Sequence, residues 1–276
     1  MFDTIFIICD SNFSIPECFS YLVSRVAINR FYEHSIPFQM EIIEISEKCD
    51  ETNVEYYNKA ADYWQTVTPT IDGMLGGFAK ISHTDIDGSN KFLKFLLRGG
   101  GGVSDGGPGT ERALDCGAGI GRITKHLLTK HFQSVDLVEQ DKHFLEKARD
   151  YLAGNSRVGN LYCAGLQNFT FSQDQYNVIW CQWVLGHLTK EHLIQFFRRC
   201  SKGLKAGGYI VVKENVTSSG EVEEDEEDSS VTRPPEVLRE IFSAADLSIV
   251  KEFKQNKFPK ELYAVHMFAL RPKTAL

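Results

Sequence analysis

The stretch "NVIWCQWVLGHL" at residues 177–188 ends an apolar run with side chains that can do chemistry. Residues 178–180 are typical of a buried strand, whereas Gln182, Trp183 and His187 stand where that strand would leave the sheet. An amide can hold a ligand or a backbone group, a flat ring can accept an apolar partner, and an imidazole can take a proton. The bland interpretation is structural, with Trp183 in the core and His187 at the entry of a helix.

A glycine turn, "LDCGAGIGR", follows the first regular strand and opens a helix. Gly117, Gly119 and Gly121 form GxGxG, whereas dinucleotide binders prefer GxGxxG, whose last position is Arg122 here. Glu139 ends the next strand, where a carboxylate can accept hydrogen bonds from ribose hydroxyls. Arg122 can pair with a carboxylate on the ligand. A nucleoside with an amino-acid tail needs both groups, so the pattern predicts S-adenosylmethionine, against the simpler reading of a generic turn with a surface Arg and Glu.

Strand and helix patterns alternate from residue 112, which predicts a parallel sheet covered on both faces. Strands are expected at 112–118, 134–139, 161–166, 176–183, 209–215, 247–255 and 263–270, and helices at 121–132, 141–153, 189–204 and 235–245. Asp141 and Thr189 are expected as N-caps. The link "NKFPKEL" is too short for a crossover helix, so the last two strands should pair antiparallel.

Two amphipathic patterns, at residues 53–67 and 89–97, predict a helical cap before the sheet. The glycine-rich segment 98–110 precedes the first strand and lacks GK[ST], which favours a flexible link over a phosphate loop. The expected organisation is an N-terminal extension of uncertain order at 1–50 and one domain at 51–276, with the cap at 51–97 and the core at 112–276. Within the extension, residues 1–39 are either an isoform-specific addition or a short helix packed on the domain.

Composition and charge exclude several classes of protein. The formal net charge is −7, and the run "EVEEDEED" at 221–228 supplies seven of the acids, so the chain has no basic footprint for nucleic acid. Such a run is usually a solvated, disordered loop; we expect one or two of its charges to contact substrate and the rest to attract basic tails. Seven cysteines without a CxxC pair indicate a reducing compartment, and no zinc motif is present. The first residues are not expected to form a membrane span or a secretory signal.

Several segments together closely resemble the protein α-N-terminal methyltransferases: "YYNKAADYWQTVTPTIDGMLGGF", "ALDCGAGIGRITK", "VIWCQWVLGHLT", "KENV" and "DSSVTR". The resemblance covers roughly residues 53–270. It implies S-adenosylmethionine-dependent methylation of the free α-amino group of proteins that begin Xaa-Pro-Lys. It also implies an α/β, Rossmann-like class I methyltransferase fold, with a seven-stranded mixed sheet, helices on both faces and an N-terminal helical cap. The N-P-P-Y signature of amide and adenine methylation and the double-E loop of arginine methylation are both absent.

Functional residues follow from the resemblance motif by motif. It implies a cofactor site of Gly117, Arg122, Glu139, Leu166, Gln167 and Gln182. It implies a peptide channel of Trp64, Trp183, Asn215, Asp225, Ser230 and Tyr263, with Asp228 and His187 as catalytic proton acceptors and no metal. The chain departs from the family pattern at Glu139, where the best-known members have Asp, and in the acidic run, which is one residue longer between Asn215 and Asp228 than expected and bears most on the assignment of Asp225.

The implied partners are proteins with basic Xaa-Pro-Lys N-termini, such as histone-like or ribosomal proteins, with no direct nucleic-acid or membrane contact. The chain is expected to be a monomer in the nucleus and cytoplasm. Two alternatives are a class I methyltransferase for a small-molecule amine and a catalytically silent, cofactor-binding adaptor. Labelled cofactor incubated with peptides that have a free or an acetylated N-terminus would separate the three.

Overall fold

The structure is a computed structural model that describes residues 40–44, 53–100 and 107–273, all of which belong to one compact unit. Of the expected extension at 1–50, residues 40–44 are described and the rest lie outside the described residues, as does the centre of the glycine-rich link at 101–106. Within the described part of the chain, no helix is long and apolar enough to cross a bilayer.

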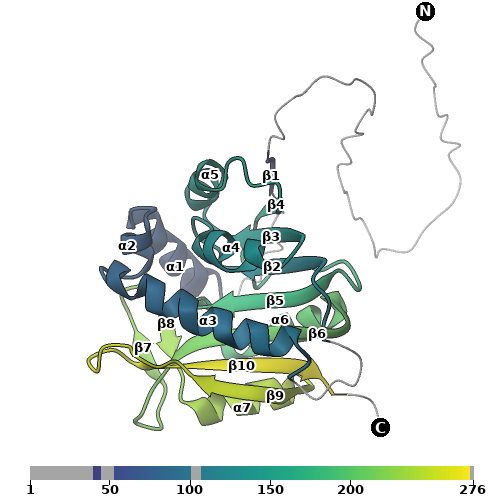
Figure 1. Cartoon of the computed structure of the whole chain (residues 1–276). Coiled ribbons are helices and arrows are strands. Elements are labelled where there is room, and N and C mark those ends of the chain that lie inside the picture. The colour runs from purple at the N-terminus through teal and green to yellow at the C-terminus, as the bar shows by residue number, and fades with distance from the viewer. Residues whose placement is uncertain (1–39, 45–52, 101–106, 274–276) are drawn as a thin grey trace, which may run out of the picture. The chain divides into compact units, whose positions relative to one another are not determined.

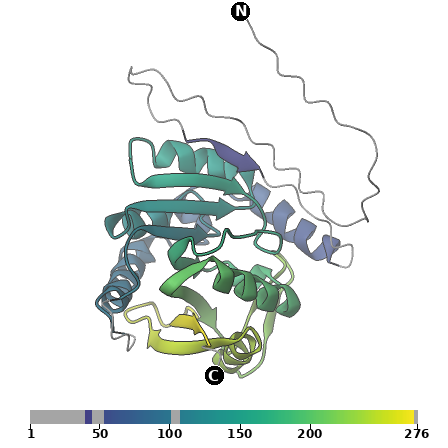
Figure 2. The same ribbon diagram turned by 90° about the vertical axis from the view of Figure 1, so that its right-hand side faces the viewer.

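An eight-stranded sheet forms the middle layer, with helices on both of its faces (Figure 1, Figure 2). Its strand order is β1-β4-β3-β2-β5-β6-β10-β9. The bounds are β1 Ile42–Glu44, β2 Arg112–Cys116, β3 Ser134–Glu139, β4 Val158–Cys163, β5 Tyr176–Gln182, β6 Leu204–Val216, β9 Leu247–Lys254 and β10 Ala264–Pro272. Strand β10 runs antiparallel to both of its neighbours, β6 and β9, and the other pairs are parallel. The mixed sheet with its closing antiparallel pair is therefore confirmed.

The sheet has eight strands rather than the seven expected. The additional strand, β1, pairs in parallel with the end of β4, from Leu161 to Cys163. Its neighbour Met40 is buried, and Ile42 packs against the same small core cluster. A three-residue strand is too short to show a side-chain period, which is why the sequence pattern did not reveal it.

Strand β5 explains how the core divides into two layers. Its side chains alternate, so that Val178 and Trp180 pack on one face of the sheet while Ile179 and Cys181 pack on the other. Because both faces are covered, all of β5 is buried and reads as one apolar run. The first face carries α3 (Ser82–Leu97), α4 (Arg122–His126) and α5 (Lys142–Tyr151), and the second carries α6 (Lys190–Gly203) and α7 (Pro235–Ala244).

Both predicted N-caps are confirmed. The Asp141 carboxylate accepts from the Phe144 N–H at 3.0 Å, and the Thr189 hydroxyl accepts from the His192 N–H at 3.3 Å. The expected helix at 121–132 is instead the short α4 followed by a 3₁₀ turn at Leu128–Lys130.

The cap comprises α1 (Val54–Thr66), α2 (Ile71–Met74), a 3₁₀ turn at Ala79–Ile81, and α3. Helix α3 begins at Ser82, seven residues before the predicted start at 89. Its first turns bury polar side chains, Asp85 and Ser89, toward the sheet. An apolar period cannot detect a helix whose buried face is polar, so this part of the cap was missed.

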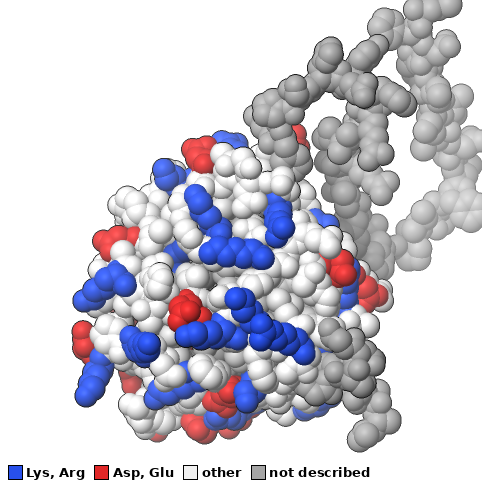
Figure 3. Space-filling view, in the orientation of Figure 1, with Lys and Arg blue, Asp and Glu red and all other residues white. Residues whose placement is uncertain are grey.

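The acidic run is ordered as a small hairpin, which corrects the expectation of a disordered loop. Strand β7 (Glu223–Asp225) pairs antiparallel with β8 (Ser230–Thr232). The Ser219 hydroxyl donates to the Glu223 carboxylate at 2.9 Å and anchors the approach to the hairpin. On the face that carries α3, by contrast, Lys and Arg side chains predominate (Figure 3). The net charge of −7 is thus distributed unevenly over the molecule.

Candidate active site

Residues at the carboxyl ends of β2, β3 and β5 line a pocket of about 980 Å³, part of which is open to solvent. Ligands of open α/β sheets bind at this edge. The structure brings all of the predicted cofactor residues to the pocket wall: Gly117, Arg122, Glu139, Leu166, Gln167 and Gln182. Apolar side chains complete the lining, including Val138, Phe144 and Ala164.

The glycine turn brings bare backbone to this pocket. Gly117 and Gly119 have φ values of 64° and 55°, a region that favours glycine. A Cβ on Gly117 would lie 2.3 Å from a methyl carbon of Val184, and one on Gly119 would lie 2.2 Å from the Met74 sulfur. Glycine therefore suits both positions, and both residues present backbone to the pocket.

The Glu139 carboxylate is held by hydrogen bonds from backbone N–H groups, one of them in the glycine turn. Its Oε2 accepts from the Gly119 N–H at 2.9 Å, and its Oε1 accepts from the Asp141 N–H at 3.1 Å. Burial raises the pKa of Glu139, although these N–H bonds oppose the shift. Each carboxylate oxygen has two acceptor positions, so one remains on each for a ribose hydroxyl. The geometry fits the role predicted for this residue.

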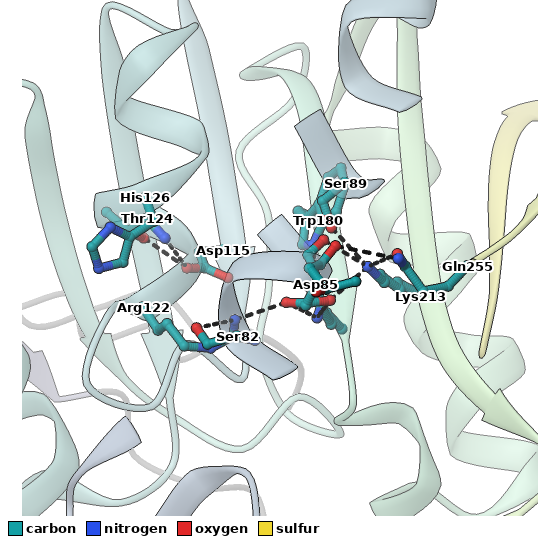
Figure 4. A network of polar contacts seen from close by, with 12 residues as sticks. Ser82, Asp85, Ser89, Asp115, Arg122, Thr124, His126, Trp180, Lys213 and Gln255 are labelled. Carbon is teal, nitrogen blue, oxygen red and sulfur yellow. Dashed lines mark hydrogen bonds and ion pairs between the residues drawn. The ribbon is translucent and has the colours of Figure 1, made fainter. Parts of the chain in front are cut away.

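Asp85, a residue of α3 that sequence reasoning missed, bonds to Arg122 (Figure 4) and to Gln182. The Arg122 Nη1 donates to Asp85 Oδ2 at 2.7 Å. The Gln182 amide nitrogen lies 2.9 and 3.0 Å from the two Asp85 carboxylate oxygens. The Gln182 carbonyl oxygen accepts from the Trp180 indole N–H at 3.1 Å. The polar atoms of Gln182 thus bond to Asp85 and Trp180, and its side chain forms part of the pocket floor.

A second cavity of about 1290 Å³ opens beside the first. The structure brings the predicted peptide-channel and catalytic residues together around it: Trp64, Trp183, His187, Asn215, Asp225, Asp228, Ser230 and Tyr263. Some side chains line both cavities, namely Trp64, Met74, Leu75, Trp183 and His187. The two cavities therefore meet at the exit of β5, where the sequence placed its chemical side chains.

The imidazole of His187 is oriented by the cap. Trp64 donates its indole N–H to His187 Nε2 at 3.1 Å. Because Nε2 is then an acceptor, the proton of the neutral ring is on Nδ1. Burial lowers the pKa of His187, while the nearby Asp228 carboxylate opposes that shift. His187 Nε2 and Asp228 Oδ2 are 4.0 Å apart, so the two groups face one another without a hydrogen bond.

Three buried polar atoms at this junction have no hydrogen-bond partner among the described residues. They are Asp228 Oδ1, His187 Nδ1 and the indole nitrogen of Trp183. Buried polar groups in folded proteins are nearly always paired, so each unpaired one calls for an explanation. Trp183 and His187 line both cavities and Asp228 lines the second, so each of these atoms lies where it can bond to a ligand.

The turn that presents Trp183 is fixed by Glu214, a second residue that sequence reasoning missed. Trp183 has a φ of 53°, which is uncommon for a non-glycine residue. The Glu214 carboxylate accepts from the N–H groups of Val184 and Leu185, both at 3.0 Å. Burial raises the pKa of Glu214 to about 7. The motif "KEN" had suggested only Asn215, although its glutamate is what holds the turn.

Helix α1 is docked on the start of α6. The Tyr57 hydroxyl lies 2.6 Å from His192 Nδ1, and the Tyr56 hydroxyl donates to the Gly186 carbonyl at 3.2 Å. These bonds keep Trp64, on the same helix, at the junction of the cavities.

The outer end of the second cavity is acidic. Tyr263 is 45% exposed and donates its hydroxyl to the Glu223 carboxylate at 2.6 Å. Asp225 stays on the cavity wall despite the altered length of its segment, and its carboxylate accepts from the Glu227 N–H at 2.9 Å. Among the described residues, no group of His, Cys, Asp and Glu side chains is arranged to hold a metal ion.

Comparison with known proteins gives a consistent result. A family model described as AdoMet dependent proline di-methyltransferase matches residues 52–271. The chain is 51% identical over 222 residues to N-terminal Xaa-Pro-Lys N-methyltransferase 1 of Danio rerio, covering 80% of this chain and 97% of the relative. The Homo sapiens protein of the same name is 48% identical over 222 residues, with the same coverage. A SAM-dependent methyltransferase structure from Leishmania major superposes with a TM-score of 0.72 at 40% identity, covering 78% of this chain and 83% of that one.

Proposed function

This chain belongs to the AdoMet dependent proline di-methyltransferase family, and we propose on that basis that it methylates the free α-amino group of proteins that begin Xaa-Pro-Lys. It is a methyltransferase with the class I fold, and S-adenosylmethionine is its methyl donor. The observation that carries the proposed substrate is the unpaired, buried Asp228 Oδ1 on the wall of the second cavity. A carboxylate oxygen there accepts a proton from an amine that enters through the second cavity.

The pocket fits the cofactor. The glycine turn, the Glu139 carboxylate and the cationic Arg122 match its nucleoside and amino-acid parts. When bound, it supplies an electrophilic methyl group on a sulfonium. Glu139 would hold the ribose, and Arg122 the carboxylate, while Leu166 and Gln167 would border the base.

Transfer requires a neutral amine, because a protonated amine has no lone pair. A free α-amine has a pKa of roughly 7.7–8.0, so a modest contribution from a base is enough near neutral pH. We assign the base to Asp228, since its Oδ1 is unpaired whereas His187 Nε2 already accepts from Trp64. The nitrogen lone pair would form the new N–CH3 bond as the S–CH3 bond breaks, leaving a neutral thioether, and the resulting ammonium would give one proton to Asp228, so that atoms and charge balance. His187 then acts by holding Trp64 and bordering the carboxylate.

The second cavity suits the first residues of a basic peptide. The ring of Trp183 offers a flat apolar surface for proline at the second position, and Phe258 extends it at a centroid distance of 6.4 Å. Asn215 would hold the N-terminal residue, beside Ser230. Carboxylates at the outer end, including Asp225, would meet lysine at the third position by attraction of opposite charges.

The expected cellular setting follows from these features. Proteins with basic tails, such as histone-like or ribosomal proteins, fit the acidic outer end of the cavity. We propose that the chain acts on them as a monomer in the nucleus and cytoplasm, without contacting nucleic acid directly.

A peptide assay tests the proposal. A peptide beginning Ser-Pro-Lys should accept labelled methyl from S-adenosylmethionine, whereas Ser-Ala-Ala and the N-acetylated Ser-Pro-Lys peptide should not. Transfer to the acetylated peptide would contradict the proposed acceptor. A small-molecule amine as the preferred acceptor would favour the alternative enzyme, although the wide second cavity argues against it. No transfer to any acceptor despite cofactor binding would indicate an adaptor.

A further inference from the structure

The polar network under the cofactor pocket contains two buried cations that pair with a single carboxylate. Arg122 is on the pocket wall, but its partner Asp85 also pairs with Lys213 of β6, which does not line the pocket (Figure 4). The side chains of Asp85 and Lys213 are both 0% exposed, and that of Arg122 is 5% exposed. Burying charges is costly unless they are paired, so this arrangement calls for a function.

We propose that Lys213 is a positioning residue for the cofactor: it neutralises Asp85, so that Arg122 presents an uncompensated positive charge to the cofactor's carboxylate. Lys213 would thereby set the affinity for that carboxylate without touching it. This rests on the proposed placement of the cofactor against Arg122.

Burial lowers the pKa of Lys213 and the Asp85 carboxylate opposes that shift, while the contacts of its Nζ suit an ammonium group. Its Nζ lies 2.5 Å from Asp85 Oδ1, 3.1 Å from the Asp85 carbonyl oxygen, 2.9 Å from the Ser89 hydroxyl and 2.9 Å from Gln255 Oε1. All four partners accept hydrogen bonds here. A protonated lysine offers three donors and no acceptor, which suits this surrounding, whereas a neutral amine would turn a lone pair toward an acceptor.

The charges of the network do not cancel. Burial alone would raise the pKa of Asp85, but Lys213 and Arg122 together lower it, so Asp85 is ionised. One carboxylate then faces two cations, which leaves one positive charge. Two further acids are near, Glu139 on the pocket wall and Asp115, whose carboxylate accepts from the Thr124 N–H and hydroxyl. Burial raises the pKa of Asp115 to about 7, so it is largely neutral at pH 6.

The partners of Asp85 approach it from two opposite sides. Gln182 and Arg122 approach Asp85 from the pocket side, and Lys213 approaches from beneath with Ser89 and Gln255. Without Lys213, the Asp85 charge would be available to Arg122 alone. The two would form a neutral pair, and the carboxylate of the cofactor would lose its attraction to the pocket floor.

Binding of two ligands at pH 6 tests the proposal. S-adenosylhomocysteine carries the carboxylate, and 5′-deoxy-5′-(3-aminopropylthio)adenosine lacks only that group. Wild type should prefer the first. Lys213→Met should lower the preference about tenfold, as a unit charge does over roughly 10 Å at an effective dielectric constant of about 20. The double variant Asp85→Asn with Lys213→Met removes both charges and should restore most of the preference. Arg122→Ala should abolish it.

The outcomes separate the proposals. A wild type without any preference would overturn the placement of the carboxylate, and this inference with it. A wild-type preference that Lys213→Met leaves unchanged would overturn the role of Lys213 alone. Equal loss of both ligands in Lys213→Met, or a double variant that stays as weak as the single one, would show that Lys213 is merely structural. A thermal melt of each variant confirms that folded protein is being titrated.

Discussion

Polar groups are paired with one another under the floor of the cofactor pocket but are left unpaired near the junction with the second cavity. Under the floor, Asp85 is bonded to Arg122, Gln182 and Lys213, and the network is closed. In the second cavity, beside the junction, Asp228 Oδ1 is buried with no partner among the described residues. A closed network fixes one geometry in advance, whereas an unpaired acceptor binds only when a donor arrives.

The difference matches the two ligands. The cofactor is the same in every catalytic cycle, so a prebuilt floor serves it. The acceptor amine must arrive, be oriented and lose a proton, so the groups that meet it are left unpaired. The variants below either break this contrast or sharpen it, and they are ordered by the size of the expected effect.

Asp228→Asn removes the unpaired acceptor and should have the largest effect. The variant should lower kcat about 10³-fold, within the range that general bases contribute, and leave cofactor affinity unchanged. Steady-state kinetics and calorimetry give the two readouts. Glu226→Gln is a matched control, since it removes the same charge from an exposed position of the same run. A comparable loss in Glu226→Gln would mean that only long-range charge matters.

Trp183→Ala should act mainly on the peptide. Stacking is made in the ground state and the transition state alike, so KM for the peptide should rise while kcat changes little. The loss should be about 1–3 kcal/mol in kcat/KM, as large aromatic contacts provide. If Trp183 is only a core residue, the melting temperature and activity should instead fall together, with no shift in KM for the folded fraction.

Two variants of His187 test whether this residue is a base or a positioning group. His187→Gln retains an acceptor for the Trp64 N–H but cannot take up a proton, and His187→Ala lacks both. If His187 positions the junction, Gln should preserve most of kcat and Ala should lose about tenfold. Equal, large losses in both variants, with partial recovery at high pH, would assign the proton to His187 after all.

Glu214→Gln should have the smallest effect on activity and should change mainly the pH dependence of stability. The folded pKa of Glu214, about 7, lies above its ordinary value of 4.5, so the folded state holds the proton more tightly than the unfolded state. Its contribution to stability is therefore present below about pH 4.5 and is lost as pH rises through 7. Gln can accept the same two N–H bonds without titrating. Denaturant unfolding at pH 5 and pH 8 should show the variant gaining on wild type at the higher pH, and a constant difference would contradict this.

Sequence reasoning reached the parts of the site that lie on regular, apolar elements. The ends of β2, β3 and β5 were predictable because alternating strands and helices gather their carboxyl ends at one edge. Glu139 and Gln182 followed from that rule, and the resemblance supplied the second cavity.

The residues it missed share a physical cause. Asp85 and Lys213 are charged side chains buried against one another, and patterns of hydrophobicity assign such residues to the surface. Glu214 acts through backbone N–H groups of a turn with positive φ, which leaves no trace in composition. Whether a buried polar group is hydrogen-bonded depends on the three-dimensional arrangement of its neighbours. The contrast between the floor and the junction could therefore be seen only in the structure.

The central claim is that the methyl group goes to an α-amine, and locating it on the product tests this most directly. A Ser-Pro-Lys peptide should be incubated with the enzyme and S-adenosylmethionine and fragmented in a mass spectrometer. The account predicts that every added methyl is on the N-terminal fragment and that the lysine side chain is unmodified. A methyl group on the lysine ε-nitrogen, with a free N-terminus, would contradict it.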